Sequence, residues 1–181
     1  MPRLSILLLL LPLSACQTSA ILDEDSPLRP PPPGSRLILN QSISIPAHSA
    51  HVVLQGGRVV SGEDINRYHP NCRLEVQKVR DTSQVLQPDE FVVLRSRQES
   101  RTAGLEQRLH VAGPFHGGAV GPSFVMYQTI LELQSVKQPQ VRWMTCEQWG
   151  DPAIGQHLTP REIRNALGDV MRLELPAATP P

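Results

Sequence analysis

The stretch CRLEVQKV, residues 72–79, alternates apolar and polar side chains along most of its length. Leu74 and Val76 stand two positions apart, with polar residues on either side of each. Because successive side chains of a β-strand point to opposite faces, this pattern predicts one buried face and one polar face. The same pattern recurs along the chain and predicts a mainly β protein.

Short strand-like segments separated by Pro and Gly account for most of the remaining apolar residues. They are residues 37–39 with Ile43 and Ile45, 52–54, 59–60, 91–97, 107–111, 124–133, 141–146 and 170–175. The pair Gly56-Gly57 suits a tight hairpin turn. This spacing predicts a small antiparallel β-sandwich or barrel-like domain.

One short helix is signalled near the C-terminus. Thr159 can cap it, Pro160 occupies its first position, and Glu162 completes a capping box. Gly168 is a stop signal. We expect two to three helical turns packed on one end of the sheet, and a second helical turn within residues 64–68.

The chain begins with a leader. Arg3 supplies positive charge, and residues 4–13 (LSILLLLLPL) form an apolar stretch typical of a secretory signal. A helix that spans a bilayer needs about 20 apolar residues, so this segment is too short to span one.

The segment Leu13-Ser14-Ala15-Cys16 resembles the lipobox of bacterial lipoproteins. The resemblance covers only the first sixteen residues, and an ordinary secretory leader with an incidental cysteine is the alternative. It implies that residues 1–15 are removed and that Cys16 carries acyl chains of the palmitate type, which anchor the protein stably when there are two or more. In such lipoproteins an Asp after the cysteine favours the inner membrane. Gln17 follows here, so the resemblance implies the outer membrane, with the domain in the periplasm rather than at the inner membrane or on the cell surface.

Residues 16–35 are predicted to be a tether, and residues 36–181 a single domain. The tether contains an acidic cluster and the run Pro30 to Pro33, with almost no apolar periodicity. Proline-rich chain is extended, at about 3.1 Å per residue, and suits a spacer. The alternative is that the prolines bind a groove on a partner.

Three cysteines are present, and lipidation of Cys16 leaves Cys72 and Cys146. An even pair in an oxidising compartment predicts a disulfide that joins the strand beginning at Cys72 to the strand carrying Trp143. A metal site that uses His69 with Cys72, or a redox thiol pair, lacks the expected ligand or thiol spacing.

Composition excludes several function classes. Loss of Arg3 leaves the mature chain with a net charge of about −1, which argues against nucleic-acid binding. Basic residues are nearly all arginine, with Lys78 and Lys137 the two lysines. The six histidines are scattered singly, and no catalytic serine motif is present. We therefore expect no enzyme activity, no metal and no cofactor.

Two regions are candidate binding sites. The loop 113–123 (GPFHGGAVGPS) carries Phe115 and His116, and Phe115 is a plausible apolar anchor. Trp149 and Asp151, with Glu147 and Trp143 nearby, can line a groove for carbohydrate or peptidoglycan. Trp143 itself is expected in the core, because the chain has only seven aromatic residues.

These features favour a non-enzymatic, membrane-anchored periplasmic lipoprotein that binds or supports another envelope component, with an envelope protein as partner besides the membrane lipid. The alternatives are a module that binds carbohydrate, peptidoglycan or another small ligand, and a periplasmic hydrolase with an unrecognised site. Beyond the lipobox, no resemblance to a characterised family is evident.

Overall fold

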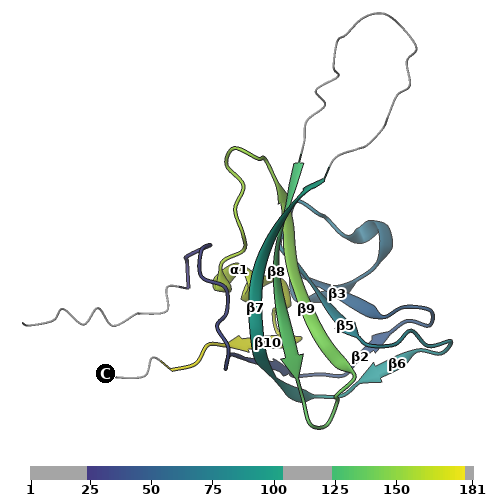
Figure 1. Cartoon of the computed structure of the whole chain (residues 1–181). Coiled ribbons are helices and arrows are strands. Elements are labelled where there is room, and N and C mark those ends of the chain that lie inside the picture. The colour runs from purple at the N-terminus through teal and green to yellow at the C-terminus, as the bar shows by residue number, and fades with distance from the viewer. Residues whose placement is uncertain (1–23, 104–123, 178–181) are drawn as a thin grey trace, which may run out of the picture.

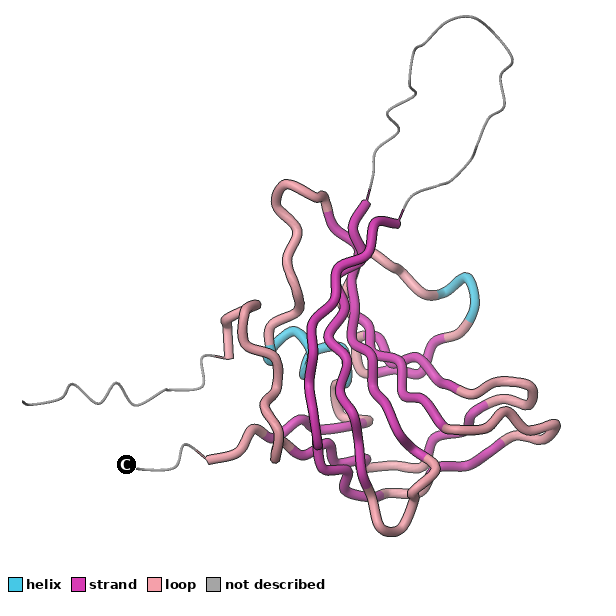
Figure 2. Tube along the Cα trace, in the orientation of Figure 1, coloured by secondary structure: helices cyan, strands magenta, loops and turns pink. Residues whose placement is uncertain are grey.

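The structure is a computed structural model that describes residues 24–103 and 124–177. In chain order the elements are β1 (Arg36–Leu39), β2 (Ile43–Ile45), β3 (His51–Gln55), β4 (Arg58–Val60), η1 (Gly62–Asp64), β5 (Asn71–Val76), β6 (Gln84–Leu86), β7 (Asp89–Ala103), β8 (Phe124–Gln134), β9 (Val141–Gly150), α1 (Pro160–Leu167) and β10 (Met171–Glu174). Figure 2 shows that strands dominate and that the helices are short. Within these ranges no helix is long and apolar enough to cross a bilayer.

Eight strands form one antiparallel sheet in the order β10-β1-β7-β8-β9-β5-β3-β4, while β2 pairs with β6 in a small second sheet. The large sheet curls into a half-barrel (Figure 1). Register shifts at Val93/Arg95 in β7 and at Glu75/Val76 in β5 add local twist and bending. The prediction of a mainly β domain is therefore confirmed, and the barrel-like alternative describes it better than the sandwich.

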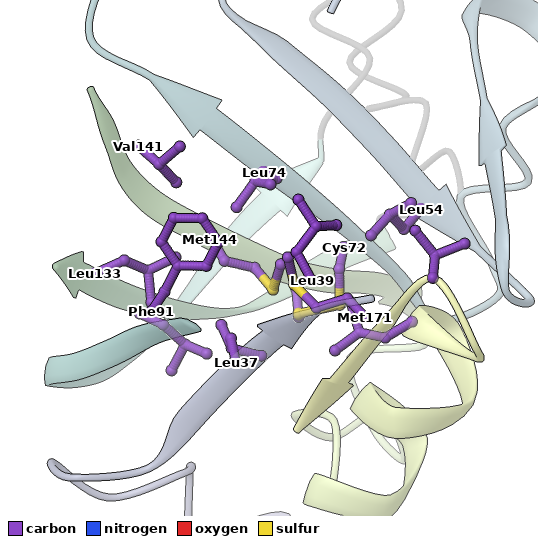
Figure 3. Close-up of a cluster of buried hydrophobic side chains, with 14 of the residues drawn as sticks. Leu37, Leu39, Leu54, Cys72, Leu74, Phe91, Leu133, Val141, Met144 and Met171 are labelled. Atoms are coloured by element: carbon purple, nitrogen blue, oxygen red, sulfur yellow. A yellow bond between two sulfur atoms is a disulfide. The ribbon is translucent and has the colours of Figure 1, made fainter. Parts of the chain in front are cut away.

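The core lies on one face of this sheet because apolar residues alternate along each strand. In β5, Cys72, Leu74 and Val76 are buried, and Arg73 and Glu75 between them are only partly buried. Figure 3 shows the cluster where β1, β5, β7, β8, β9 and β10 contribute their inward side chains. Burial of each large aliphatic side chain stabilises the fold by about 2 kcal/mol.

Helix α1 covers part of this core. Thr159 and Glu162 form the predicted capping box, Pro160 is in the first turn, and Gly168 ends the helix. Ile163, Ala166 and Leu167 are buried in the core cluster, so the apolar face of the helix packs where the sequence expected it. The second helical turn forms earlier than predicted, as the short 3-10 helix η1.

The sheet and the helix meet at a tight backbone contact. Gly57, in the turn between β3 and β4, donates its N–H to the carbonyl of Ala166 at 3.1 Å. A Cβ atom placed on Gly168 would lie 2.4 Å from the Cα of Gly57. The turn that leads into the edge strand β4 therefore packs directly on the C-terminal end of α1. Only glycine fits at this contact.

Cys72 and Cys146 form a disulfide. The two residues are directly opposite each other in the antiparallel β5–β9 pair. The bond therefore joins the strand that begins near Cys72 to the strand carrying Trp143, as predicted.

Trp143 itself is a correction. It was expected in the core, yet it is 37% exposed, and the neighbouring Met144 occupies the buried position. The reason is the strand period, because Trp143 lies opposite Glu75 and Glu132, on the polar face of the sheet. The guanidinium of Arg142 lies 5.6 Å from the indole centroid.

The N-terminal part of the described chain is attached to the domain. Glu24 forms an ion pair with Arg164 of α1, and its carbonyl accepts a hydrogen bond from the N–H of Arg161. Gly34 and Ser35 exchange backbone hydrogen bonds with Val93 of β7, both at 2.8 Å. The sequence predicted an extended spacer up to residue 35, whereas residues 24–35 lie against the helix and the sheet (Figure 1).

We expect replacement of both Cys72 and Cys146 by Ala to lower the free energy of unfolding by about 4 kcal/mol. The two cysteines are 74 positions apart, and without the bond the unfolded chain has more conformations, which stabilises the unfolded state by about this amount. Urea unfolding of the oxidised protein and of the double variant measures the difference. A variant as stable as the parent, or two reactive thiols in the unreduced parent, contradicts the structural role of the bond.

We also expect Gly168→Ala to destabilise the protein more than Gly56→Ala. Both glycines have nearly the same positive φ, +53° and +56°, but a Cβ on Gly56 meets nothing within 4 Å. A positive φ strains the backbone of either variant, by about 1–3 kcal/mol. At Gly168, where ψ is −139°, the backbone is also in a region that is essentially restricted to glycine, and the clash with Gly57 adds about 1–3 kcal/mol. Thermal unfolding of the two variants measures the combined effect, and equal losses would show that neither the contact nor this backbone conformation matters.

Candidate functional site

The face of the sheet opposite the core carries polar and aromatic side chains in register. Rows of side chains cross neighbouring strands on this face, and their members come from β7, β8, β9, β5 and β3. The rows are Arg101, Met126 and Trp149; then Glu99, Gln128, Glu147 and Asn71; then Arg97, Ile130, Thr145, Arg73 and Val53. Residues as far apart in the sequence as Val53 and Thr145 therefore lie in one row through strand pairing alone.

The segment between β4 and β5 borders this face. The side chain of Gln55 holds it through a hydrogen bond from Nε2 to the carbonyl of Asn66 at 2.8 Å and another to Oε1 from the Asn66 N–H at 3.0 Å. The N–H of Trp149 donates to the carbonyl of Arg67 at 2.7 Å. Arg67 and Tyr68 are thereby placed beside the end of β9.

Together the sheet face and this segment enclose a recess of about 450 Å³, which we call the Trp149 recess. Its walls include Arg67, Arg73, Arg101, Gln128, Glu147 and Trp149. A volume of this size lies within the usual range of small-ligand sites, and a few convergent polar groups on partly apolar walls are typical of them.

Two further aromatic rings pack around Trp149, the indole that lines the recess. The rings of Tyr68 and Phe124 lie edge to face with centroids 5.3 Å apart, and Tyr68 packs against Trp149 in the same way at 6.0 Å. The guanidinium of Arg67 lies 5.0 Å from the Trp149 ring centroid. A cation over an indole is stabilised by the ring quadrupole, so Arg67 and Trp149 hold each other in place.

The three arginines of the recess differ in their partners. Arg101 pairs with Glu99 at 2.8 Å and Arg73 with Glu75 at 3.0 Å, whereas Arg67 has no carboxylate partner within the described residues. Hydrogen bonds from Arg101 and Arg97 hold the pKa of the Glu99 carboxyl below its ordinary value. Arg67 is thus the guanidinium whose charge is available to a ligand.

Gln128 and Glu147 supply the polar floor. The Nε2 of Gln128 donates to the Glu147 carboxylate at 2.6 Å, and the Asn71 side chain donates to the Glu147 carbonyl at 3.1 Å. These bonds fix the carboxylate and the amide in position. Together they present acceptors and a donor at the base of the recess, a set that recognises hydroxyl, amide or carboxyl groups.

A serine and a histidine also meet, on the opposite face of the sheet. The Ser100 hydroxyl lies 3.3 Å from Nε2 of His157. Burial lowers the pKa of His157 below its ordinary value, and an interaction with the backbone of Gln128 opposes this effect. No carboxylate in the described ranges orients the imidazole through Nδ1, which is buried without a hydrogen-bond partner there. The pair therefore differs from a Ser-His-Asp triad.

The structure brings together only part of the predicted site. Trp149 and Glu147 line the recess, but Asp151 does not, because its carboxylate accepts the Ala153 N–H at 2.7 Å within the turn after β9. Phe115 and His116, like Cys16, lie outside the described residues.

Because the bonded sulfur of Cys72 offers no thiolate, the disulfide leaves the metal alternative with His69 without its sulfur ligand. Within the two described ranges no cluster of three or more His, Cys, Asp or Glu side chains forms a candidate metal site.

Comparison with protein-family models, with curated proteins and with solved structures finds no match to this chain.

Sequence reasoning missed Arg67, Tyr68, Arg73, Arg101 and Gln128. Arg73, Arg101 and Gln128 occupy polar positions of alternating strands, which by default face solvent. The one available signal was the segment Arg67-Tyr68, where a cation and an aromatic residue stand together between two strands.

We expect the stability of the protein to fall as the pH drops below the ordinary histidine pKa of about 6.5, and part of this loss to come from His157. A histidine whose pKa is lowered on folding binds fewer protons in the folded state than in the unfolded state. Its contribution to the free energy of unfolding is therefore complete above the ordinary pKa and is lost as the pH falls below it. Melting temperatures between about pH 8 and pH 5 measure the loss. His157→Gln should flatten the curve relative to His48→Gln, and parallel curves would exclude a role for His157.

Proposed function

We propose that this protein is a non-enzymatic lipoprotein of the cell envelope whose β-domain binds another envelope component through the Trp149 recess. The observation that carries the proposal is the recess itself. It places an indole, a guanidinium with no carboxylate partner among the described residues and a fixed carboxylate-amide pair around one cavity of about 450 Å³. None of these groups is needed to fill the core, which lies on the opposite face of the sheet.

The leader and the disulfide support the envelope as the compartment. The segment Leu13-Ser14-Ala15-Cys16 resembles a lipobox, and a disulfide inside the domain favours an oxidising environment such as the periplasm. Cys16 and the membrane lipid would then form the anchor, with the outer membrane favoured by Gln17.

The attachment of Glu24 to α1 limits how far the domain extends from such an anchor. Only residues 17–23 separate Cys16 from Glu24. A fully extended chain spans at most about 3.6 Å per residue, so the α1 side of the domain would stay within about 30 Å of the lipid. The protein therefore suits a partner held close to the membrane.

A second candidate function is binding of carbohydrate, peptidoglycan fragments or another small ligand. The observation that favours it is the combination of Trp149 with the Gln128 amide and the Glu147 carboxylate in a recess of small-ligand size. Aromatic surface and paired hydrogen-bonding groups are the chemistry that sugar hydroxyls require.

Site-specific photocrosslinking in cells tests the leading proposal. A photoreactive amino acid replaces Met126, inside the recess, or Arg58, an exposed residue of β4 outside it. We expect one dominant envelope protein to crosslink from position 126 and not from position 58. Trp149→Ala should reduce this product at least about tenfold, a loss of about 1.4 kcal/mol or more, while the melting temperature shows that the variant is folded.

Equal crosslinking from both positions, or none from position 126, contradicts a protein partner in the recess. The second candidate is then tested by titration of the purified protein with muropeptides. Saturable binding that Trp149→Ala abolishes would establish the ligand-binding alternative.

A further inference from the structure

A second cavity, of about 370 Å³, lies where the segment after β5 meets the turn between β8 and β9. We call it the basic pocket. Its walls include the cationic side chains of Lys78, Arg80 and Arg142 and the amides of Gln77, Gln84 and Gln140. All of these residues belong to the described part of the chain, and none of them lines the Trp149 recess.

The charge in the basic pocket has one sign. Its lining contains three cations and no carboxylate. Two carboxylates lie outside the lining. Glu132 is 3.6 Å from Nη2 of Arg142, and Asp81, next to Arg80 in the sequence, is 3.7 Å from Nδ1 of His48. The chain as a whole has a formal charge of +0, so this is a local concentration of positive charge rather than a consequence of composition.

Arg142 contains an unsatisfied donor. Its Nε is buried and has no hydrogen-bond partner within the described residues. The guanidinium lies against the ring of Trp143, and its contact with Glu132 at 3.6 Å is longer than a hydrogen bond. Buried N–H groups are nearly always paired in native structures, and a turn of this guanidinium towards an anion in the pocket would give the donor an acceptor.

The pocket is held open by bonds between its walls. The N–H of Gln77 donates to the carbonyl of Gln140 at 2.9 Å, which joins the two segments. The Nε2 of Gln84 donates to the carbonyl of Lys78 at 3.0 Å. Because these bonds fix the backbone, binding of an anion requires little reorganisation of the walls.

We propose that the basic pocket binds a phosphate group. Arginine forks and a lysine ammonium are the side chains that recognise phosphate oxygens, through charge-assisted and bidentate hydrogen bonds. The phosphate is either free in solution, with about two negative charges, or a phosphodiester of a lipid headgroup, with one. Both present anionic phosphoryl oxygens, which the three cations of the pocket can bind. This inference stands apart from the function proposed for the Trp149 recess.

The test uses the full-length protein, labelled with 15N-arginine and purified in a maltoside detergent, which contains no phosphate. Inorganic phosphate is titrated at constant ionic strength while the Nε–H signal of Arg142 is followed by NMR. In a second arm, a short-chain phosphatidylglycerol is added to the micelles, with the matching phosphatidylcholine as the comparison. We expect a saturable shift of the Arg142 signal.

Variants locate the effect. The double variant Lys78→Gln/Arg80→Gln should lower the affinity at least about tenfold. The control Arg58→Gln/Arg172→Gln removes the same charge from β4 and β10, outside the pocket, and should leave the affinity unchanged. Overlaid amide spectra of the two double variants show that both remain folded.

A shift in the first arm alone identifies free phosphate, and a shift with phosphatidylglycerol but not phosphatidylcholine identifies an anionic headgroup. Either result supports the proposal if the pocket variant loses the shift and the control keeps it. The absence of a saturable shift in both arms overturns it, as does an equal loss in both double variants, which would reveal only a general attraction of charge.

Discussion

The disulfide between Cys72 and Cys146 fixes the register of β5 on β9, and both faces of the sheet depend on that register. A slip of β5 by one residue relative to β9 would turn the side chains of β5 over, so that Leu74 would meet water while Arg73 would enter the core. With the cysteines opposite each other, Glu147 falls beside Asn71 and Gln128. The bond that secures the core therefore also assembles the floor of the Trp149 recess.

Local patterns were sufficient to predict the elements that depend on local physics. Alternation along residues 72–79 predicted β5 and its buried face, although the strand ends at Val76 and Val79 is exposed. The Thr159-Pro160-Glu162 signal predicted α1 with its capping box. Trp143 is the exception, because its position in the strand, and not its aromatic character, decides which face of the sheet it occupies. The alternation set by the buried Met144 puts it on the polar face.

Such local patterns could not predict the candidate site, because its residues come from segments that are far apart in the sequence. Arg67 reaches Trp149 only because Gln55 holds the intervening segment, and Arg101 lies near both only through the β7–β8–β9 register. The attachment of Glu24 to Arg164 joins residues 140 positions apart, and nothing in the acidic cluster of the tether indicates that partner. Sequence reasoning supplied Trp149 and Glu147, and tertiary pairing supplied the rest of the recess.

Pairing of charges distinguishes the two cavities. In the Trp149 recess, Glu99 and Glu75 offset two of the three arginines, which leaves Arg67 as a single available cation beside aromatic surface. In the basic pocket Glu132 lies 3.6 Å from Arg142, whereas Lys78 and Arg80 have no carboxylate partner among the described residues. The first arrangement suits a ligand that is mostly neutral or apolar and carries one acidic group, whereas the second suits a compact anion. Because the cavities lie at separate places on the sheet and share no lining residue, occupation of one need not exclude the other.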